Sequence, residues 1–305
     1  MPARQPDVTR PHHRPRAITI IVVGEKMSRE KALEMLDLLP APHQQSQTIL
    51  LERRAEEAIR SMRKFLPEPP SVQELAEEAR VTPWHFIRIF RRAVGIPPGA
   101  YLAALRIAQA KKLLLDTPDR VTDICFDLGF ESLGSFTSRF TRLVGVSPTA
   151  FRRLADEFSP QWLEDYLILQ ERMEPDRAGM KIRGTVRSPY PFRGPIFIGL
   201  FPKPIPEGFP QAGILLMEPG PFAIPHALPS GYLMAAGIVS PRDPQAYLVP
   251  TSSLLVGVLP LPRGSAREHL VLDLRPSKPL DPPILLALLG CLVRPDPACF
   301  DGRAR

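Results

Sequence analysis

Asparagine is absent from the 305-residue sequence, and cysteine is scarce, with three residues in all. Without asparagine the chain has no site for N-glycosylation. Three cysteines cannot build a disulfide framework, and none of them forms a Cys-x-x-Cys pair of the kind that holds zinc. The sequence therefore indicates a reducing compartment, and we expect a cytoplasmic protein with no metal site.

Long hydrophobic runs are also missing. The longest apolar stretches, at residues 284–293 and 18–23, are much shorter than the ~20 residues that a membrane helix needs. Nucleophile-elbow, phosphate-loop, zinc-protease and dinucleotide-binding motifs do not occur, and His226 and His269 are isolated. We therefore expect no membrane partner, no cofactor and no enzyme activity.

Proline and charge divide the chain into parts. Of the 38 prolines, 15 lie in residues 1–174 and 23 in residues 175–305, so the second part cannot be mainly helical. The net charge of +7 is also uneven. Residues 50–155 and 175–305 each carry an excess of five basic residues, whereas residues 156–174 are acidic. We therefore predict a helical domain at 50–155, an acidic linker helix at 156–176 and a second domain at 177–305.

The first 49 residues show little periodicity. Residues 1–27 are rich in proline and arginine, which predicts a disordered leader. The codons for Gly-Glu-Lys just before Met27 would resemble a purine-rich ribosome-binding site, so Met27 is an alternative start. Residues 28–49 are interpreted as a short helix and a linker.

The sequence contains an internal repeat with a constant offset of fifty residues. The segment RIFRRAVGIPPGAY at 88–101 aligns with SRFTRLVGVSPTAF at 138–151. Upstream of each copy, apolar residues recur at the i, i+3, i+4, i+7 spacing of an amphipathic helix, beginning at Val72 and at Val121. The repeat predicts two helix-turn-helix units.

Helix-start signals agree with this division. Ser71 and Glu74 have the spacing of a capping box, and Thr82 and Ser147 each precede a proline that would open a helix. Between the units, residues 100–117 contain no glycine or proline and are rich in alanine, leucine and lysine. This composition predicts a connecting helix that holds the units in a fixed relation.

The second helix of each unit has two distinct faces. The inward residues are predicted to be Phe86, Ile89, Phe90 and Ala93 in the first, and Phe136, Phe140 and Leu143 in the second. The outward residues are Trp84, Ile87, Arg88 and Arg91 in the first, and Ser135, Ser138, Arg139 and Arg142 in the second. A solvated face on an ordinary helical bundle is the alternative interpretation. An outward tryptophan beside two arginines favours a surface that stacks on sugar or contacts a thymine methyl group.

With these motifs, residues 51–153 resemble the paired helix-turn-helix DNA-binding domain of AraC/XylS-type transcription regulators. The LR-x-x-x-A connecting helix, the Gly-Phe turn and the VSP-x-x-F/Y-R end occur in order. The resemblance implies that each second helix enters a major groove, at points roughly 34 Å apart on the duplex. By position, the residues implied to face bases or sugar are Trp84, Ile87 and Arg88 in one groove and Gly134, Ser135, Ser138 and Arg139 in the next.

Two positions depart from the family pattern. Ile87 stands where the family often has a polar residue, and Ser138 stands where many members have arginine, with Arg139 one place later. Sequence preference is therefore not transferable from relatives. Arg88 is a candidate for a bidentate bond to guanine. Phosphate contacts are expected from helix N-termini and from Lys111, Lys112, Arg142 and Arg152.

One cysteine and the acidic linker leave alternatives open. Cys125 stands where the family usually has alanine, and we expect a small buried core residue, with a redox switch as the alternative. The predicted linker helix at 156–176 packs on the DNA-binding domain or, alternatively, forms a dimer contact.

Residues beyond 180 alternate between short apolar runs and proline or glycine clusters, which is typical of an all-β sandwich. Strands are predicted at 181–187, 196–201, 213–217, 222–225, 231–239, 253–259 and 269–274, and 284–293 is ambiguous between strand and helix. The stretches IRGTV, GPIFIGLF and GPFAIPHALPSGYLMAAG resemble the prealbumin-like, carboxypeptidase-regulatory-like sandwich. In this interpretation Phe222, Ile224, Tyr232 and Met234 turn toward the core.

The sequence thus predicts a chain of two classes, an all-α double helix-turn-helix domain followed by an all-β, immunoglobulin- or prealbumin-like sandwich. The resemblance implies a sequence-specific transcription regulator, such as an activator, that binds double-stranded DNA and RNA polymerase. It also implies that the second domain senses a small-molecule effector or forms a homodimer. The alternative function is a protein- or glycan-binding sandwich in which the helical domain is only a scaffold.

Overall fold

The computed structural model describes residues 42–157, 181–225, 230–239, 245–249, 254–264 and 267–287. The leader, the helix expected before residue 40, nearly all of the acidic linker helix, His226, Cys291 and Cys299 lie outside these ranges. Residues 47–305 belong to one compact unit. Its helices, with the start of α2 just before it, are α2 (Pro42–Lys64), α3 (Val72–Glu78), α4 (Pro83–Val94), α5 (Pro98–Asp116), α6 (Val121–Asp127), α7 (Leu133–Val144) and α8 (Pro148–Glu157).

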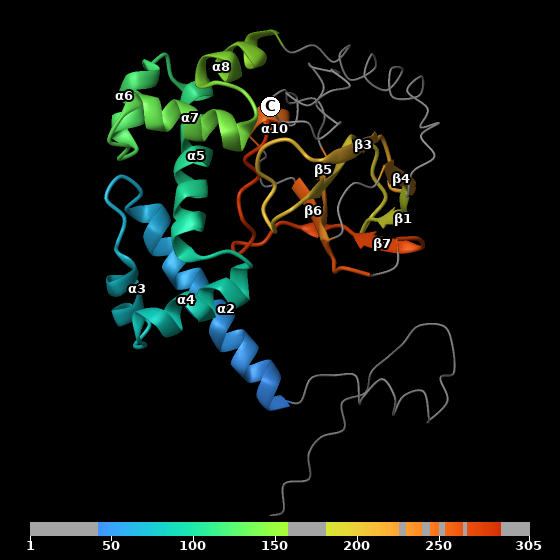
Figure 1. Ribbon diagram of the computed structural model, residues 1–305, viewed down its shortest axis with the longest axis horizontal. Helices are drawn as coiled ribbons and strands as arrows, with labels where there is room; N and C mark the ends of the chain where they lie inside the picture. The colour runs from blue at the N-terminus through green and yellow to red at the C-terminus, as the bar shows by residue number, and fades with distance from the viewer. Residues whose placement is uncertain are drawn as a thin grey trace, which may run out of the picture. The chain divides into compact units, whose positions relative to one another are not determined.

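The fifty-residue repeat is a structural repeat. Helices α4 and α7 each have twelve residues, and each ends at a glycine in the left-handed conformation, Gly95 at φ +89° and Gly145 at φ +93°. A side chain at either position would be strained, which explains why both copies end their second helix with glycine. Figure 1 shows α5 running between the α3–α4 pair and the α6–α7 pair.

Each copy is built on the same three aromatic rings. In the first, Phe86, Phe90 and Tyr101 pack in series, in tilted and edge-to-face contacts, with ring centroids 5.9 and 5.6 Å apart. In the second, Phe136, Phe140 and Phe151 do so at 5.7 and 5.7 Å. All six rings are fully buried, so the inward faces predicted for the two helices are confirmed.

The predicted helix starts are confirmed as well. The Ser71 hydroxyl accepts a bond from the Glu74 amide, and the Glu74 carboxylate accepts one from the Ser71 amide, which is a complete capping box. The Thr82 hydroxyl accepts from the His85 amide, and the Ser147 hydroxyl accepts from the Ala150 amide. The connecting helix expected over 100–117 is α5.

Helix α2 differs from the prediction, because residues 42–49 were expected to be part of a linker and instead form its first turns. The helix is anchored farther along by a buried stripe at i, i+3, i+4, i+7 spacing, made of Ala55, Ala58, Ile59 and Met62. Two of the four are alanines, and this weakens the hydrophobic signal that the sequence carries.

The second domain contains two sheets. Its strands are β1 (Lys181–Arg187), β2 (Ile196–Phe201), β3 (Ala212–Leu216), β4 (Pro221–Pro225), β5 (Gly231–Ile238), β6 (Leu254–Leu261), β7 (Leu270–Asp273) and β8 (Arg275–Pro276), with a short helix α10 (Gln245–Leu248) before β6. The strand order is β4-β1-β7 in one sheet and β3-β2-β5-β6-β8 in the other, with β1 and β7 parallel. All seven predicted strands are present, whereas β8 and α10 were not predicted.

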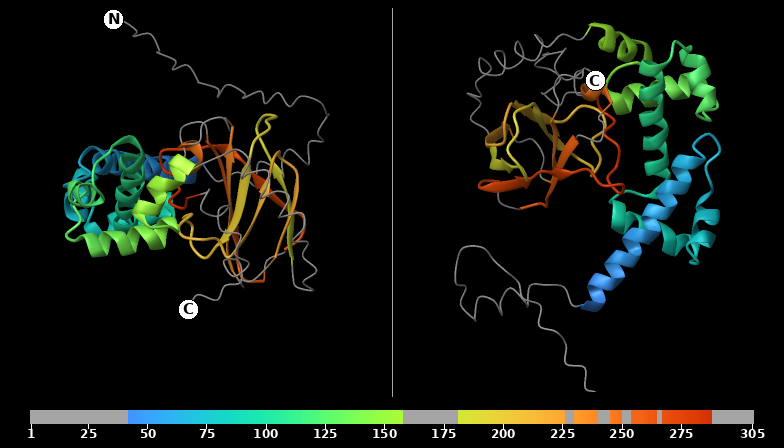
Figure 2. Two further views of the ribbon diagram at one scale, coloured as in Figure 1. Left: turned by 90° about the horizontal axis from the view of Figure 1, so that it is seen from above. Right: turned by 180° about the vertical axis from the view of Figure 1, so that it is seen from behind.

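The two sheets share a buried core, as in a sandwich. Ile182, Phe222 and Leu272 from the three-stranded sheet pack with Ile198 and Leu233 from the five-stranded sheet. The predicted class, helices followed by a β-sandwich, is confirmed. In both views of Figure 2 the helices and the strands form separate groups. The finer likeness to prealbumin-like sandwiches stays a prediction.

The five-stranded sheet is covered on both faces, and this corrects one prediction. Phe222 and Ile224 point into the sandwich core, but Tyr232 and Met234 point to the opposite face, where they join the hydrophobic cluster of the helical domain. Along β5 the six residues from Leu233 to Ile238 are all buried. A strand buried on both faces has no polar alternation from which the inward face could be read.

Two segments of the β domain pack against the helical domain. The docking loop, residues 202–211 between β2 and β3, donates from the Gly208 amide to the Leu143 carbonyl at 2.6 Å. The strap, residues 277–287 after β8, donates from the Ala287 amide to the Val144 carbonyl at 2.9 Å. Both bonds end in the last turn of α7. Added side chains at Gly95 and Gly145 would touch Pro204 and Phe209 of the docking loop, so the loop lies at the C-terminal ends of α4 and α7.

Candidate nucleic-acid interface

Helix α4 presents its outward residues to solvent. Trp84 is 67% exposed and Ile87 37%, and both Arg88 and Arg91 are exposed. The Arg88 guanidinium lies over the Trp84 ring at 4.6 Å from its centroid. Because the residues are four apart, one helical turn brings the two side chains together. The pair forms a flat cationic and aromatic surface before any ligand is bound.

Helix α7 presents a different surface. Gly134, Ser135, Ser138, Arg139 and Arg142 are all exposed, and open space surrounds the position of a side chain at Gly134. The Ser135 hydroxyl donates to the Ser132 carbonyl at 2.9 Å and accepts from the Ser132 hydroxyl at 3.0 Å. Its proton is thus engaged in the first helical turn, and Ser135 is left with one lone pair as an acceptor.

A hollow of about 610 Å³ lies beside α7, lined by Arg106, Arg139, Arg142, Glu131, Ser135 and Ser138 among others. Arg106 comes from α5 and was not predicted as a site residue. Its guanidinium donates to the carbonyls of Leu66 and Pro67 at 3.4 and 3.2 Å. Burial lowers the pKa of Arg106, and repulsion from the Arg139 charge lowers it further. Three arginines against one carboxylate give this hollow a positive potential that suits a phosphate group.

Gly129 allows the turn between α6 and α7 to lie close to Arg106. Its φ is +72°, and an added side-chain carbon would lie 2.6 Å from the Pro67 carbonyl oxygen and 3.0 Å from the Arg106 guanidinium. The turn between α6 and α7 therefore comes too close to Arg106 and to the loop after α2 for any residue with a side chain.

Lys111, expected to contact phosphate, is 1% exposed. Its ammonium donates to the strap carbonyls of Ile284 and Leu286 at 3.2 and 3.3 Å and lies over the Phe151 ring at 5.6 Å. The prediction is wrong because Lys111 lies on the side of α5 that the strap covers. Burial lowers the pKa of Lys111 to about 7.

Arg152 is partly buried and bonded to main-chain carbonyls. It donates to the Leu114 carbonyl at 2.9 Å and to the Asp119 carbonyl at 2.7 Å, where it joins α8 to the end of α5. Lys112 is exposed, but it lines a cavity between α5 and the strap. Of the four expected phosphate contacts, only Arg142 lies beside an outward recognition surface.

Cys125 is fully buried, and its burial raises the pKa of the thiol, which agrees with a small core residue. The described ranges contain no group of three or more potential metal ligands. They also contain no helix with the length and hydrophobicity required to cross a bilayer.

Two outward helices, matched in length, capping and internal packing and joined by one rigid helix, define a paired helix-turn-helix protein. A model described as a helix-turn-helix domain matches residues 75–154. The HTH-type transcriptional activator AarP of Providencia stuartii is 35% identical over 103 residues, which are 34% of this chain and 73% of AarP. The chain belongs to the AraC-type family of DNA-binding helix-turn-helix transcription regulators.

Other relatives share a smaller part of their length. The HTH-type transcriptional regulator Rv1931c of Mycobacterium tuberculosis is 37% identical over 82 residues, which are 27% of this chain and 32% of Rv1931c. A crystal structure of the DNA-binding domain of AdpA with a target DNA is 30% identical, covers 35% of this chain and 96% of that chain, and has a TM-score of 0.33. Relatives such as Rv1931c are thus matched over only about a third of their length.

Proposed function

We propose that the protein is a sequence-specific transcription regulator that inserts α4 and α7 into successive major grooves of duplex DNA. Trp84, Ile87 and Arg88 then face one groove, and Arg91 contacts the flanking backbone. In the next groove the corresponding residues are Gly134, Ser135, Ser138 and Arg139, with Arg142 toward the backbone. Two such helices enter successive grooves roughly 34 Å apart.

One observation carries this proposal. All nine residues are exposed, although the docking loop and the strap cover other parts of the helical domain. The β domain packs on α5 and on the C-terminal ends of α4 and α7, and it leaves the outward faces open. Buried aromatic rings fix the opposite side of each helix, so the exposed faces are held on a rigid support.

Binding to DNA is tested by fluorescence anisotropy with a duplex selected from genomic fragments. We expect the logarithm of the binding constant to fall linearly with the logarithm of salt concentration, since bound arginines displace counterions from phosphates. No binding to any duplex at low salt would exclude the proposal and favour a protein- or glycan-binding sandwich.

Base reading is tested separately with Arg88→Ala. A bidentate guanine contact contributes about 1–3 kcal/mol of discrimination, so the variant should lose about 5–150-fold preference at one base pair. Arg193→Ala is the matched control, because the Arg193 side chain is 91% exposed in the β domain. An equal loss of affinity on every sequence would assign Arg88 to a phosphate instead.

For the β domain we propose a role in effector sensing or in assembly of a homodimer. The support is its contact with both copies of the repeat, because the strap binds Tyr101 of the first copy and lies against Val144 of the second. Contact with RNA polymerase and a cytoplasmic location belong to the same proposal. Sedimentation of the full chain with and without its DNA site tests assembly.

A further inference from the structure

A cavity of about 480 Å³ lies between the helical domain and the strap. Helices α2 and α5 form one wall, through Arg63, Leu105 and Lys112, and the strap forms the other, through Lys278 and Ile284. The volume falls within the 300–1,000 Å³ that small-molecule sites occupy, and such sites are frequent where two domains meet. A molecule bound there would touch both domains.

The cavity carries an excess of positive charge. Arg63, Lys112 and Lys278 are exposed along its rim, and Lys111 is buried in its wall. Asp281 is the only carboxylate among its described lining residues. Three exposed cations therefore face one acid across a partly enclosed space.

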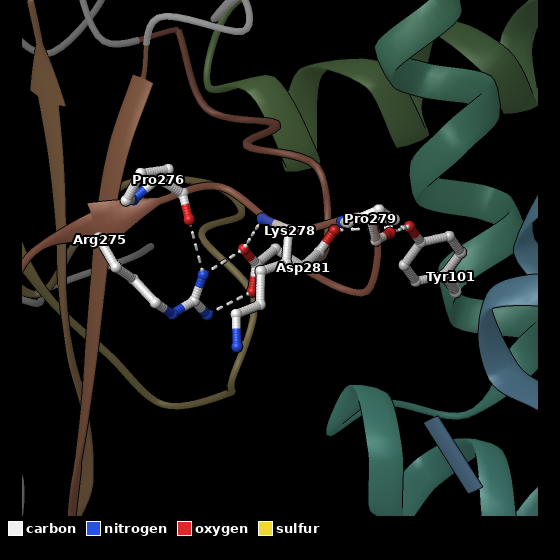
Figure 3. A network of polar contacts seen from close by, with 6 residues as sticks. All are labelled: Tyr101, Arg275, Pro276, Lys278, Pro279 and Asp281. Atoms are coloured by element: carbon white, nitrogen blue, oxygen red, sulfur yellow. Dashed lines mark hydrogen bonds and ion pairs between the residues drawn. The ribbon is translucent and has the colours of Figure 1, made fainter. Parts of the chain in front are cut away.

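Asp281 is bonded chiefly to Arg275, so its single charge cannot offset all three rim cations. Its two carboxylate oxygens accept from the Arg275 guanidinium at 2.6 and 2.7 Å, and one of them also accepts from the Lys278 amide at 2.6 Å (Figure 3). These bonds keep the pKa of Asp281 below its ordinary value, although burial acts to raise it. Asp281 thus fixes the strap to β8, and among the rim cations only Lys278 adds to the lowering of its pKa. One carboxylate that is already paired with Arg275 leaves an excess of positive charge at the rim.

The remaining lining identifies the kind of anion. Leu66, Leu105, Val249, Leu254 and Ile284 supply apolar walls. A bare inorganic ion would leave these walls uncovered, whereas an organic acid covers them with its carbon skeleton and places its carboxylates at the rim. We propose that this cavity binds a small di- or tricarboxylic acid, with Arg63, Lys112 and Lys278 as its charge partners.

The position of the cavity connects it to both copies of the repeat. The Tyr101 hydroxyl donates to the strap carbonyl of Pro279 at 3.2 Å, with the Asp281 carbonyl at 3.4 Å (Figure 3). Lys111 reaches the strap from the next part of α5 and touches Phe151 of the second copy. An acid bound between α5 and the strap would therefore change the restraint on both recognition helices. This regulatory part rests on the proposed DNA-binding function, whereas binding of the acid does not.

Calorimetric titration of the full chain, without DNA, tests the site. The probes are succinate and citrate, with inorganic phosphate and glycerol as comparisons. We expect at least one carboxylate to bind more tightly than phosphate, and glycerol not to bind. A hydrogen bond to a charged group corresponds to about 10–100-fold in affinity, so Arg63→Gln with Lys112→Gln should weaken binding by at least tenfold.

The matched control is Arg60→Gln, which removes an exposed charge from the same helix at a position that does not line the cavity. An equal loss in that control, or no binding of either acid at millimolar concentration, would overturn the proposal. Affinity for DNA is measured separately in the absence of acids, and the double variant should match the wild type. A loss of DNA affinity in the double variant would instead identify Arg63 and Lys112 as phosphate contacts. That result would overturn their assignment to the acid site, whereas the proposal that the protein binds DNA would still stand.

Discussion

Lys111 gives the sharpest test of the packing between the helical domain and the strap. Its pKa falls from 10.5 to about 7 because the side chain is buried. In the unfolded chain this lysine titrates near 10.4. Between these two pH values the native state binds fewer protons than the unfolded state, so the free energy of unfolding rises as pH increases across that window.

The magnitude follows from the pKa. Native Lys111 is about half protonated at pH 7 and about one-tenth protonated at pH 8, while the unfolded lysine remains protonated. The wild type should therefore gain about 1 kcal/mol between pH 7 and pH 8 from this group. The two strap carbonyls and the Phe151 ring favour the ammonium, so about 1 kcal/mol is an upper value.

Lys111→Met keeps an unbranched side chain of similar length and removes the titration. Urea unfolding of both proteins at pH 6, 7, 8 and 9 should show a rise in the wild type that the variant lacks. The variant also leaves the Ile284 and Leu286 carbonyls unpaired, at a cost of about 1–3 kcal/mol each. Lys112→Met, at the neighbouring exposed lysine, should follow the wild-type pH profile. Parallel profiles for the wild type and Lys111→Met would refute the reasoning.

Three further predictions concern single side chains. Gly129→Ala should lower the free energy of unfolding in urea by about 1–3 kcal/mol, because of the left-handed φ and the nearby carbonyl, whereas Gly134→Ala at an open helical position should leave it unchanged or higher. Tyr101→Phe should cost about 1 kcal/mol in the same assay through the lost bond to the strap; equal stability would mean that this bond contributes nothing. Trp84→Ala should weaken DNA binding about tenfold by anisotropy, since Arg88 loses the ring on which it stacks; the same loss in Tyr190→Ala, at an exposed aromatic residue of the β domain, would contradict this role.

The helical domain was largely predictable because its signals are local. The spacing of apolar residues, the capping residues and the glycines that end helices all act within one or two helical turns. Because the unit is repeated, each of these signals occurs twice in the sequence. Phe86 and Phe136 lie fifty residues apart and are both fully buried. Once these rings were assigned to the interior, the opposite side of each helix was predicted to be its outward face.

Lys111 was misassigned because its partners lie far away in the sequence. Lys111 bonds to residues 173 and 175 positions later in the chain. The periodicity of a helix gives no signal that such a distant segment will cover one of its faces. A lysine on an alanine- and leucine-rich helix has the pattern of a solvated face. The prediction for Tyr232 and Met234 was wrong for a related reason, since the helical domain covers their face of β5, and the sequence carries no signal of that cover.

The hydrogen bonds between α5 and the strap also bear on synthesis of the chain. Helix α8 ends at Glu157 and the strap ends at residue 287, so about 130 residues separate them, and translation at about 5–20 residues per second needs roughly 6–26 s for that length. During this interval Tyr101 and Lys111 of the nascent chain are without their strap partners. The core of the helical domain is therefore completed only after the β domain has been synthesised.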